Sequence, residues 1–337
     1  LRMSASTPGN DHRLGANEAP PAIISIFLGE QLEDVVKQLV TRGEATRSKK
    51  GDKLASGVHS LPEFEKDATD RNRTSPFAFT GNKFEFRMVG STQSISDPNV
   101  ILNTIVADVF ADVCDQLEKV ADDPKAVEME AHELTKQMLT EHQRIIFNGN
   151  GYSEEWIKEA ERRGLPNLKS MVDAIPTLVT DKSIKMFEKF GVFTKAELES
   201  RAEILFEQYA QTINIEALAT LDIAKKQIVP AVMKYQKQLA DSVAVLKETG
   251  VDTSVQEALL GDITDNLKEM YGAIGVLAED EAKAKAMDED VEKQARYYHD
   301  TIFADMSAVR QPADKLEMLV AKEDWPMPSY GDLIFEV

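Results

Sequence analysis

A regular spacing of apolar residues in the second half of the chain most constrains its fold. Six of them follow one another at intervals of three and four residues: Leu260, Ile263, Leu267, Met270, Ile274 and Leu277. Such spacing places the side chains along one side of an α-helix. A continuous apolar stripe has to be buried, so the pattern predicts antiparallel packing against another helix. We favour this core function over a face that binds a partner protein.

The preceding segment supplies a partner for this helix. A helical pattern runs from about Asn214 to Thr249 and contains Pro230. Proline has no N–H to donate and should kink the helix. Because Gly250 and the next three residues separate the two patterns, the sequence predicts a long helical hairpin.

The first hundred residues have a different pattern. Short apolar runs are separated by glycine and proline, which predicts short strands and loops. Helical periodicity begins after Pro98, and the Asp-Asp-Pro sequence at 122–124 marks a domain boundary. Residues 41–53 are rich in basic side chains, which indicates a solvated loop or a loop that touches phosphate or a neighbouring subunit.

Composition excludes some classes of function. The net charge of −19 argues against general binding to nucleic acid or to anionic membranes. No apolar run approaches the ~18 residues of a membrane span. The single cysteine, Cys114, cannot form an intrachain disulfide, and we expect a packed core thiol in a cytoplasmic protein. The five histidines show no metal-binding spacing.

The segment from Lys83 to Arg87 carries candidate chemistry. Charged and aromatic residues alternate, so a strand places Glu85 and Arg87 on one face and Phe86 on the other. A carboxylate can bind Mg²⁺ or Mn²⁺, and a guanidinium can bind phosphate. From these residues alone, an exposed ion pair on a strand remains the alternative.

The wording of three segments resembles the second half of a glutamine synthetase catalytic domain. They are Asp-His-Arg-Leu-Gly-Ala-Asn-Glu-Ala-Pro-Pro at 11–21, Asn-Arg-Thr-Ser-Pro-Phe at 72–77 and Phe-Glu-Phe-Arg at 84–87. Residues 80–87, 145–152 and the Trp-Pro-Met-Pro-Ser-Tyr-Gly ending are similar to the type III, long-chain bacterial subfamily. The resemblance implies an α+β fold: residues 1–121 form the C-terminal part of the catalytic domain, with antiparallel strands and helices. Residues 122–337 then form a helical region.

The resemblance also implies roles for three residues of the first two segments. Arg13 matches the arginine that binds the glutamate carboxylate. Glu18 matches the flap glutamate that closes over the site and helps to take a proton from ammonium. Arg73 matches the arginine that faces the transferred phosphoryl group.

Three further roles follow from the third segment. Glu85 matches a metal-ligand glutamate, and Arg87 matches an arginine that contacts substrate or phosphate. Lys83 occupies a position where a basic residue approaches the nucleotide. Asn-Gly-Asn-Gly at 148–151 mimics a glutamate-binding loop, but its place in chain order favours a turn between helices.

The implied reaction is ATP-driven ligation of ammonia to glutamate through γ-glutamyl phosphate, with Mg²⁺ or Mn²⁺. The implied assembly is a homo-oligomer, a dodecamer of two hexameric rings. Because the chain opens without methionine and lacks the family's upstream motifs, we expect a fragment that is inactive alone. The alternatives are a related glutamate–amine ligase and a non-catalytic helical assembly module.

Overall fold

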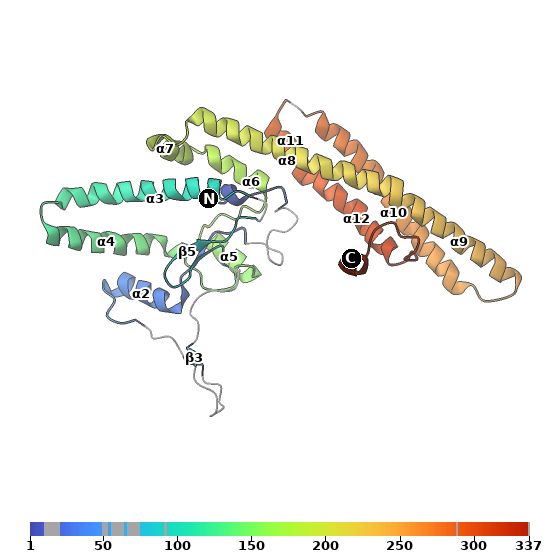
Figure 1. The fold of residues 1–337 in the computed structure, drawn as a ribbon, viewed down its shortest axis with the longest axis horizontal. Helices are drawn as coiled ribbons and strands as arrows, with labels where there is room; N and C mark the ends of the chain where they lie inside the picture. The colour runs from blue at the N-terminus through green and yellow to red at the C-terminus, as the bar shows by residue number, and fades with distance from the viewer. Residues whose placement is uncertain are drawn as a thin grey trace. The chain divides into compact units, whose positions relative to one another are not determined.

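The computed structural model describes residues 1–9, 21–48, 53–54, 64–65, 75–90, 93–287 and 289–335 (Figure 1). Arg13, Glu18 and Arg73 lie outside these residues, as do residues 49–52 of the basic stretch 41–53. The chain divides into two compact units, Leu1–Ala202 and Glu203–Val337. Helices dominate both, and a small three-stranded sheet lies in the first, so the predicted α+β class is confirmed.

The first unit contains the strands and many short helices. Its elements are η1 (Met3–Ala5), β1 (Ile26–Phe27), α2 (Gly29–Arg42), β2 (Lys53–Leu54), β3 (Phe64–Glu65), β4 (Phe77–Phe79), β5 (Phe84–Phe86), α3 (Ser96–Leu117), η2 (Glu118–Val120), α4 (Pro124–His142), η3 (Gln143–Ile145), α5 (Glu154–Arg162), α6 (Met171–Ala174), η4 (Ile175–Val179) and α7 (Asp181–Lys189). The boundary between the units falls within α8 (Lys195–Ile223). Strands β2 and β3 pair with each other, separately from the three-stranded sheet.

The three-stranded sheet has the order β1-β4-β5. Antiparallel strands are expected, and β4 and β5 pair in this way as a hairpin, whereas β1 runs parallel to β4. The hairpin turns at Gly81, whose φ of 96° suits a residue without Cβ, and Thr80 N–H donates to the Lys83 carbonyl at 2.9 Å. Beyond β1, Ile146 makes a parallel bridge to Ile26 and extends the sheet by one residue pair.

Helices α3 and α4 lie side by side as an antiparallel pair (Figure 1). Asp123 begins α4, since its carboxylate accepts the Lys125 N–H at 2.9 Å and proline occupies the first turn. Our expectation of a core thiol at Cys114 is wrong, because this cysteine is exposed. It follows Val106 and Phe110 at intervals of four residues, and that face of α3 points outward.

The predicted helical hairpin is confirmed in the second unit, where the last two long helices before residue 286 pack against each other. The further elements of this unit are η5 (Ala224–Ile228), α9 (Val229–Glu248), α10 (Ser254–Lys285), α11 (Val291–Tyr297), η6 (Tyr298–Ile302), α12 (Phe303–Glu317) and α13 (Tyr330–Phe335). Helix α10 packs against both α9 and α12 (Figure 1). The stripe residues Ile263, Met270, Ile274 and Leu277 are buried between them. The helix therefore serves the core function that its periodicity predicts.

Pro230 does not end its helix. It lies in the first turn of α9, directly after the π-helical segment η5. A proline lacks the N–H of the helical ladder and its ring collides with the carbonyl four residues earlier. The wider π turn before the proline accommodates this collision, and the predicted kink stays a prediction. Among the described helices, none has the length and apolarity that crossing a membrane requires.

Candidate functional site

Three predicted site residues lie together at β5. We call Lys83, Glu85 and Arg87 the β5 cluster. Arg87 donates to one oxygen of Glu85 through Nε at 3.1 Å and Nη2 at 3.0 Å. The other oxygen of Glu85 lies 3.3 Å from the Lys83 ammonium. The alternation of the sequence therefore brings Glu85 and Arg87 to one face, as predicted, and Lys83 lies on the same side.

The opposite face of this hairpin is aromatic. Phe84 stacks against Phe77 with 5.8 Å between ring centroids, and Phe79 contacts Phe84 at 5.2 Å. Phe86 lies opposite Phe77 in the ladder. Such cross-strand aromatic pairs stabilise the hairpin and hold the charged face in register.

The β5 cluster keeps its carboxylate ionised. Arg87 first, and then Lys83, lower the pKa of Glu85 by hydrogen bonding to the charged form. An ionised carboxylate is the ligand type that Mg²⁺ and Mn²⁺ take, so Glu85 fits a metal site in part. The described residues contain no group of three or more acidic, histidine or cysteine side chains that could hold a metal. Further ligands would have to come from elsewhere in the protein.

A cavity of about 260 Å³ lies between α2 and the β4–β5 turn. Its wall is mostly apolar, with a polar spot where the Gln31 amide donates to the Ser48 hydroxyl at 2.8 Å. The lining residues are Leu28, Gly29, Gln31, Leu32, Val35, Ser48, Phe79 and Gly81. A cavity of this kind can take a small group that is apolar on most sides.

The segment around Asn148 joins this region to the helices that follow. The expectation of a turn between helices is correct, since it connects η3 to α5. Sequence reasoning missed the function of Asn148 itself, whose side chain caps the distant start of α2. One signal was present: α2 begins after Leu28, which has no side-chain acceptor for the first N–H groups.

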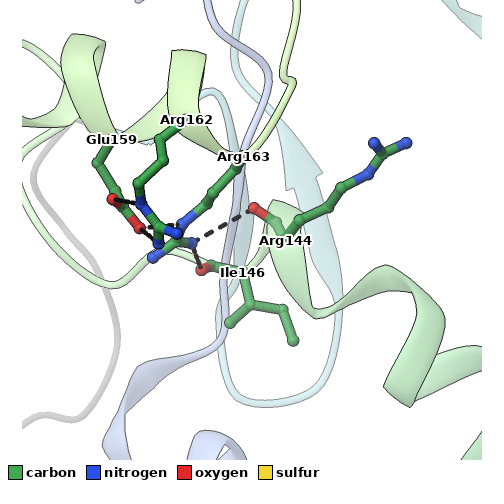
Figure 2. Close-up of polar contacts among 5 residues, drawn as sticks. All are labelled: Arg144, Ile146, Glu159, Arg162 and Arg163. Carbon is green, nitrogen blue, oxygen red and sulfur yellow. Dashed lines mark hydrogen bonds and ion pairs between the residues drawn. The ribbon is translucent and has the colours of Figure 1, made fainter.

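Arg163, directly after α5, forms hydrogen bonds with the segment that precedes Asn148 (Figure 2). Its Nη1 donates to the carbonyls of Ile146 at 3.0 Å and Arg144 at 3.3 Å. Its Nε pairs with Glu159, which Arg162 also contacts. Arg162 and Arg163 together lower the pKa of Glu159 to about 2. The arginine therefore links a strand-like segment to a helix through fixed hydrogen bonds.

Comparison with known proteins identifies the lineage. Residues 130–247 match the model of the glutamine synthetase C-terminal domain. Over its whole length the chain is 40% identical to a glutamine synthetase of Butyrivibrio fibrisolvens. Residues 130–247 thus carry a glutamine synthetase C-terminal domain, and the whole chain is similar to glutamine synthetases. Over 99% of its length it is also 38% identical to a type-3 glutamine synthetase of Dictyostelium discoideum and 35% to a glutamine synthetase of Bacteroides fragilis.

The chain spans about half the length of these relatives: 48%, 46% and 47% of the three. The β5 cluster precedes the residues that match the C-terminal domain model, whereas Asn148 and Arg163 lie within them. The chain therefore contains both a candidate site segment and residues of the matched C-terminal domain that contact its sheet.

Proposed function

We propose that the protein to which this chain belongs is a glutamate–ammonia ligase. Support comes above all from the β5 cluster, in which an ionised carboxylate lies between two cations on one strand face. Similarity to glutamine synthetases over the whole chain gives this arrangement its chemical context. The substrates are glutamate, ammonium and ATP.

The reaction activates the side-chain carboxylate of glutamate. One carboxylate oxygen attacks the γ-phosphorus of ATP, and ADP leaves, which gives γ-glutamyl phosphate. Ammonia then attacks the carbonyl carbon and phosphate leaves, so that an amide forms. Arg73 faces the transferred phosphoryl group and Arg13 holds the substrate carboxylate. Both arginines therefore place positive charge beside oxygen atoms that carry negative charge during the reaction.

The remaining residues supply the base, the lid over the site and the groups that bind nucleotide and metal. Glu18 takes a proton from ammonium and closes the site against water, which would hydrolyse the acyl phosphate. Arg87 contacts substrate or phosphate, and Lys83 approaches the nucleotide. Glu85 would hold Mg²⁺ or Mn²⁺, which supplies Lewis-acid stabilisation of phosphate charge when bound.

The proposal includes the assembly and setting of the enzyme. Similarity to glutamine synthetases supports a homo-oligomer, and we propose a dodecamer of two hexameric rings in the cytoplasm. The helical region from residue 122 onward would contribute to the contacts between subunits. Light scattering of the full-length protein measures this state directly, and a stable monomer would contradict it.

Replacement of Glu85 tests the assignment. In the full-length enzyme, Glu85→Ala should lower kcat by about 10²-fold or more, because a charged ligand is lost where phosphate charge develops. Glu207→Ala is the matched control, since Glu207 is an exposed glutamate of α8. Glutamine formation is measured with ATP, glutamate and ammonium. Near-normal turnover of the Glu85 variant would overturn its assignment.

The two alternatives differ from this proposal in what they consume. A related ligase would use another amine in place of ammonia, which a comparison of acceptor amines under the same assay reveals. A non-catalytic assembly module would show neither ATP turnover nor glutamine formation in the full-length protein.

A further inference from the structure

Helix α2 receives its N-terminal cap from a residue 120 positions away. Asn148 Oδ1 accepts the N–H of Leu28 at 2.8 Å and that of Gly29 at 3.0 Å. The same side chain donates through Nδ2 to Glu33 in the next turn at 2.6 Å. The amide thus accepts two backbone N–H groups at the start of the helix and donates to the Glu33 carboxylate.

The residues before Asn148 also join the sheet. Phe147 N–H donates to the Ile26 carbonyl at 3.0 Å, beside the parallel bridge between Ile146 and Ile26. Across the sheet, Ile26 lies opposite Phe77, and Phe77 lies opposite Phe86. A row of paired residues therefore runs from the Asn148 segment through β1 and β4 to β5, the strand of the β5 cluster.

The segment is itself held firmly from the side of α5. The ring of Phe147 stacks on Trp156 at a centroid distance of 3.8 Å, and Trp156 is buried. Arg163 bonds the preceding carbonyls, as described above (Figure 2). Gly149 has to be glycine here, because a Cβ would lie 2.5 Å from the Phe147 ring. The stacked ring cannot move away without losing its contact with Trp156.

We infer that Asn148 is a positioning residue, which fixes β1 and the start of α2 and through them the place of the β5 cluster. The inference rests on the proposed function for the role of that cluster in metal and phosphate binding. It also gives the segment that matches the glutamine synthetase C-terminal domain an indirect part in the site, through β1 and α2. The contacts of Asn148 make the helical region a support of the sheet as well as a candidate for assembly.

The test uses the full-length enzyme and two readouts. The Asn148→Ala variant lacks the cap of α2. Its backbone amide hydrogens should therefore exchange about fivefold faster than those of the wild type in peptides covering 24–34 and 76–88. It should also raise the Mg²⁺ concentration that gives half-maximal glutamine formation. Asn150→Ala is the matched control, because Asn150 caps only the N–H of Tyr152 in its own turn, at 3.0 Å.

A rescue pair separates positioning from general damage. Asn148→Asp keeps the acceptor for α2 but sets a second carboxylate against Glu33. In the double variant Asn148→Asp with Glu33→Gln, the donor and the acceptor of this hydrogen bond are exchanged. The exchange rates and the Mg²⁺ requirement should then both return toward the wild-type values. This pair retains the cap and is expected to fold even where the alanine variant does not.

The outcomes are distinct. Unchanged exchange in 76–88 would overturn the inference, because the cap would then act on α2 alone. Faster exchange there with an unchanged Mg²⁺ requirement would also overturn it. Absence of ligase activity in the wild-type enzyme would defeat the proposed function instead, while the exchange data would still decide whether Asn148 holds β5.

Discussion

At the scale of single residues, the carboxyl group of Asp305 is costly to bury. Its Oδ2 is buried and has no hydrogen-bond partner among the described residues. Burial first, and then the neighbouring Asp280 carboxylate, raise the pKa of Asp305. Asp280 stays ionised, since Lys283 lies 2.8 Å away and the Tyr297 hydroxyl donates to it at 3.0 Å. Its pKa is lowered.

This arrangement gives Asp305 a defined effect on stability. The folded chain holds the Asp305 proton more tightly than the unfolded chain, whose ordinary pKa is 3.8. The stabilisation is therefore complete below that value and is lost as pH rises through the folded-state pKa. Above the folded-state pKa the ionised group is buried beside a second carboxylate, which destabilises the fold.

Replacement of Asp305 by asparagine should remove this cost. The introduced side-chain amide can donate to Asp280, so Asp305→Asn should stabilise the protein at pH 7 by about 1–2 kcal/mol. The gain should shrink as pH falls towards about 4. Thermal unfolding across this range measures both effects, with Asp241→Asn as control because Asp241 is exposed on α9. Equal unfolding temperatures at pH 7 would contradict the prediction.

At the scale of elements, the glycines of α10 weaken a helix that tertiary packing holds in place. Gly261, Gly272 and Gly275 all lie on its exposed side, and a Cβ at each would meet nothing within 4 Å. Glycine in a helix costs conformational entropy that the buried stripe has to offset. By contrast, Gly250 ends α9 with a φ of 71°, a conformation that other residues rarely adopt.

Alanine substitutions at these two kinds of glycine should have opposite effects. Gly272→Ala should stabilise the protein by about 0.5–1 kcal/mol, because alanine loses less backbone entropy in a helix. Gly250→Ala should destabilise it by about 1 kcal/mol through strain in the left-handed region. Denaturant unfolding of the two variants measures the difference, and a destabilised Gly272→Ala protein would show that an unseen contact occupies this face.

At the scale of the whole molecule, the candidate site and the helical hairpin lie in different compact units. The β5 cluster belongs to residues 1–202, and the α9–α10 hairpin belongs to residues 203–337. The division of the chain into domains at 121 and 122 stays a prediction. It falls between the paired helices α3 and α4, both within the first unit.

The 337-residue chain alone should form no glutamine. Its described residues offer one ionised carboxylate at the β5 cluster and no group of three potential metal ligands. Divalent metals in phosphate-transfer sites need several oxygen ligands and a shaped cavity. The assay is ATP-dependent glutamine formation by the purified chain, with the full-length enzyme as positive control. Detectable turnover by the chain alone would contradict the prediction.

Much of the local structure could be predicted because its causes are local. Apolar spacing predicts α10 and its buried side, and alternation predicts the charged face of β5. The same reasoning was wrong for Cys114. Periodicity identifies the apolar face of a helix but not whether anything covers that face.

The sequence by itself determined the similarity to glutamine synthetases, the helical hairpin and the residue types of the candidate site. These depend on short patterns, in which each residue interacts with neighbours one or two turns away. Only the tertiary structure decided that Asn148 caps α2 and that the Ile146 segment extends the sheet beside β1. Those contacts join segments about 120 residues apart, where chain closure, not local preference, brings donor and acceptor together.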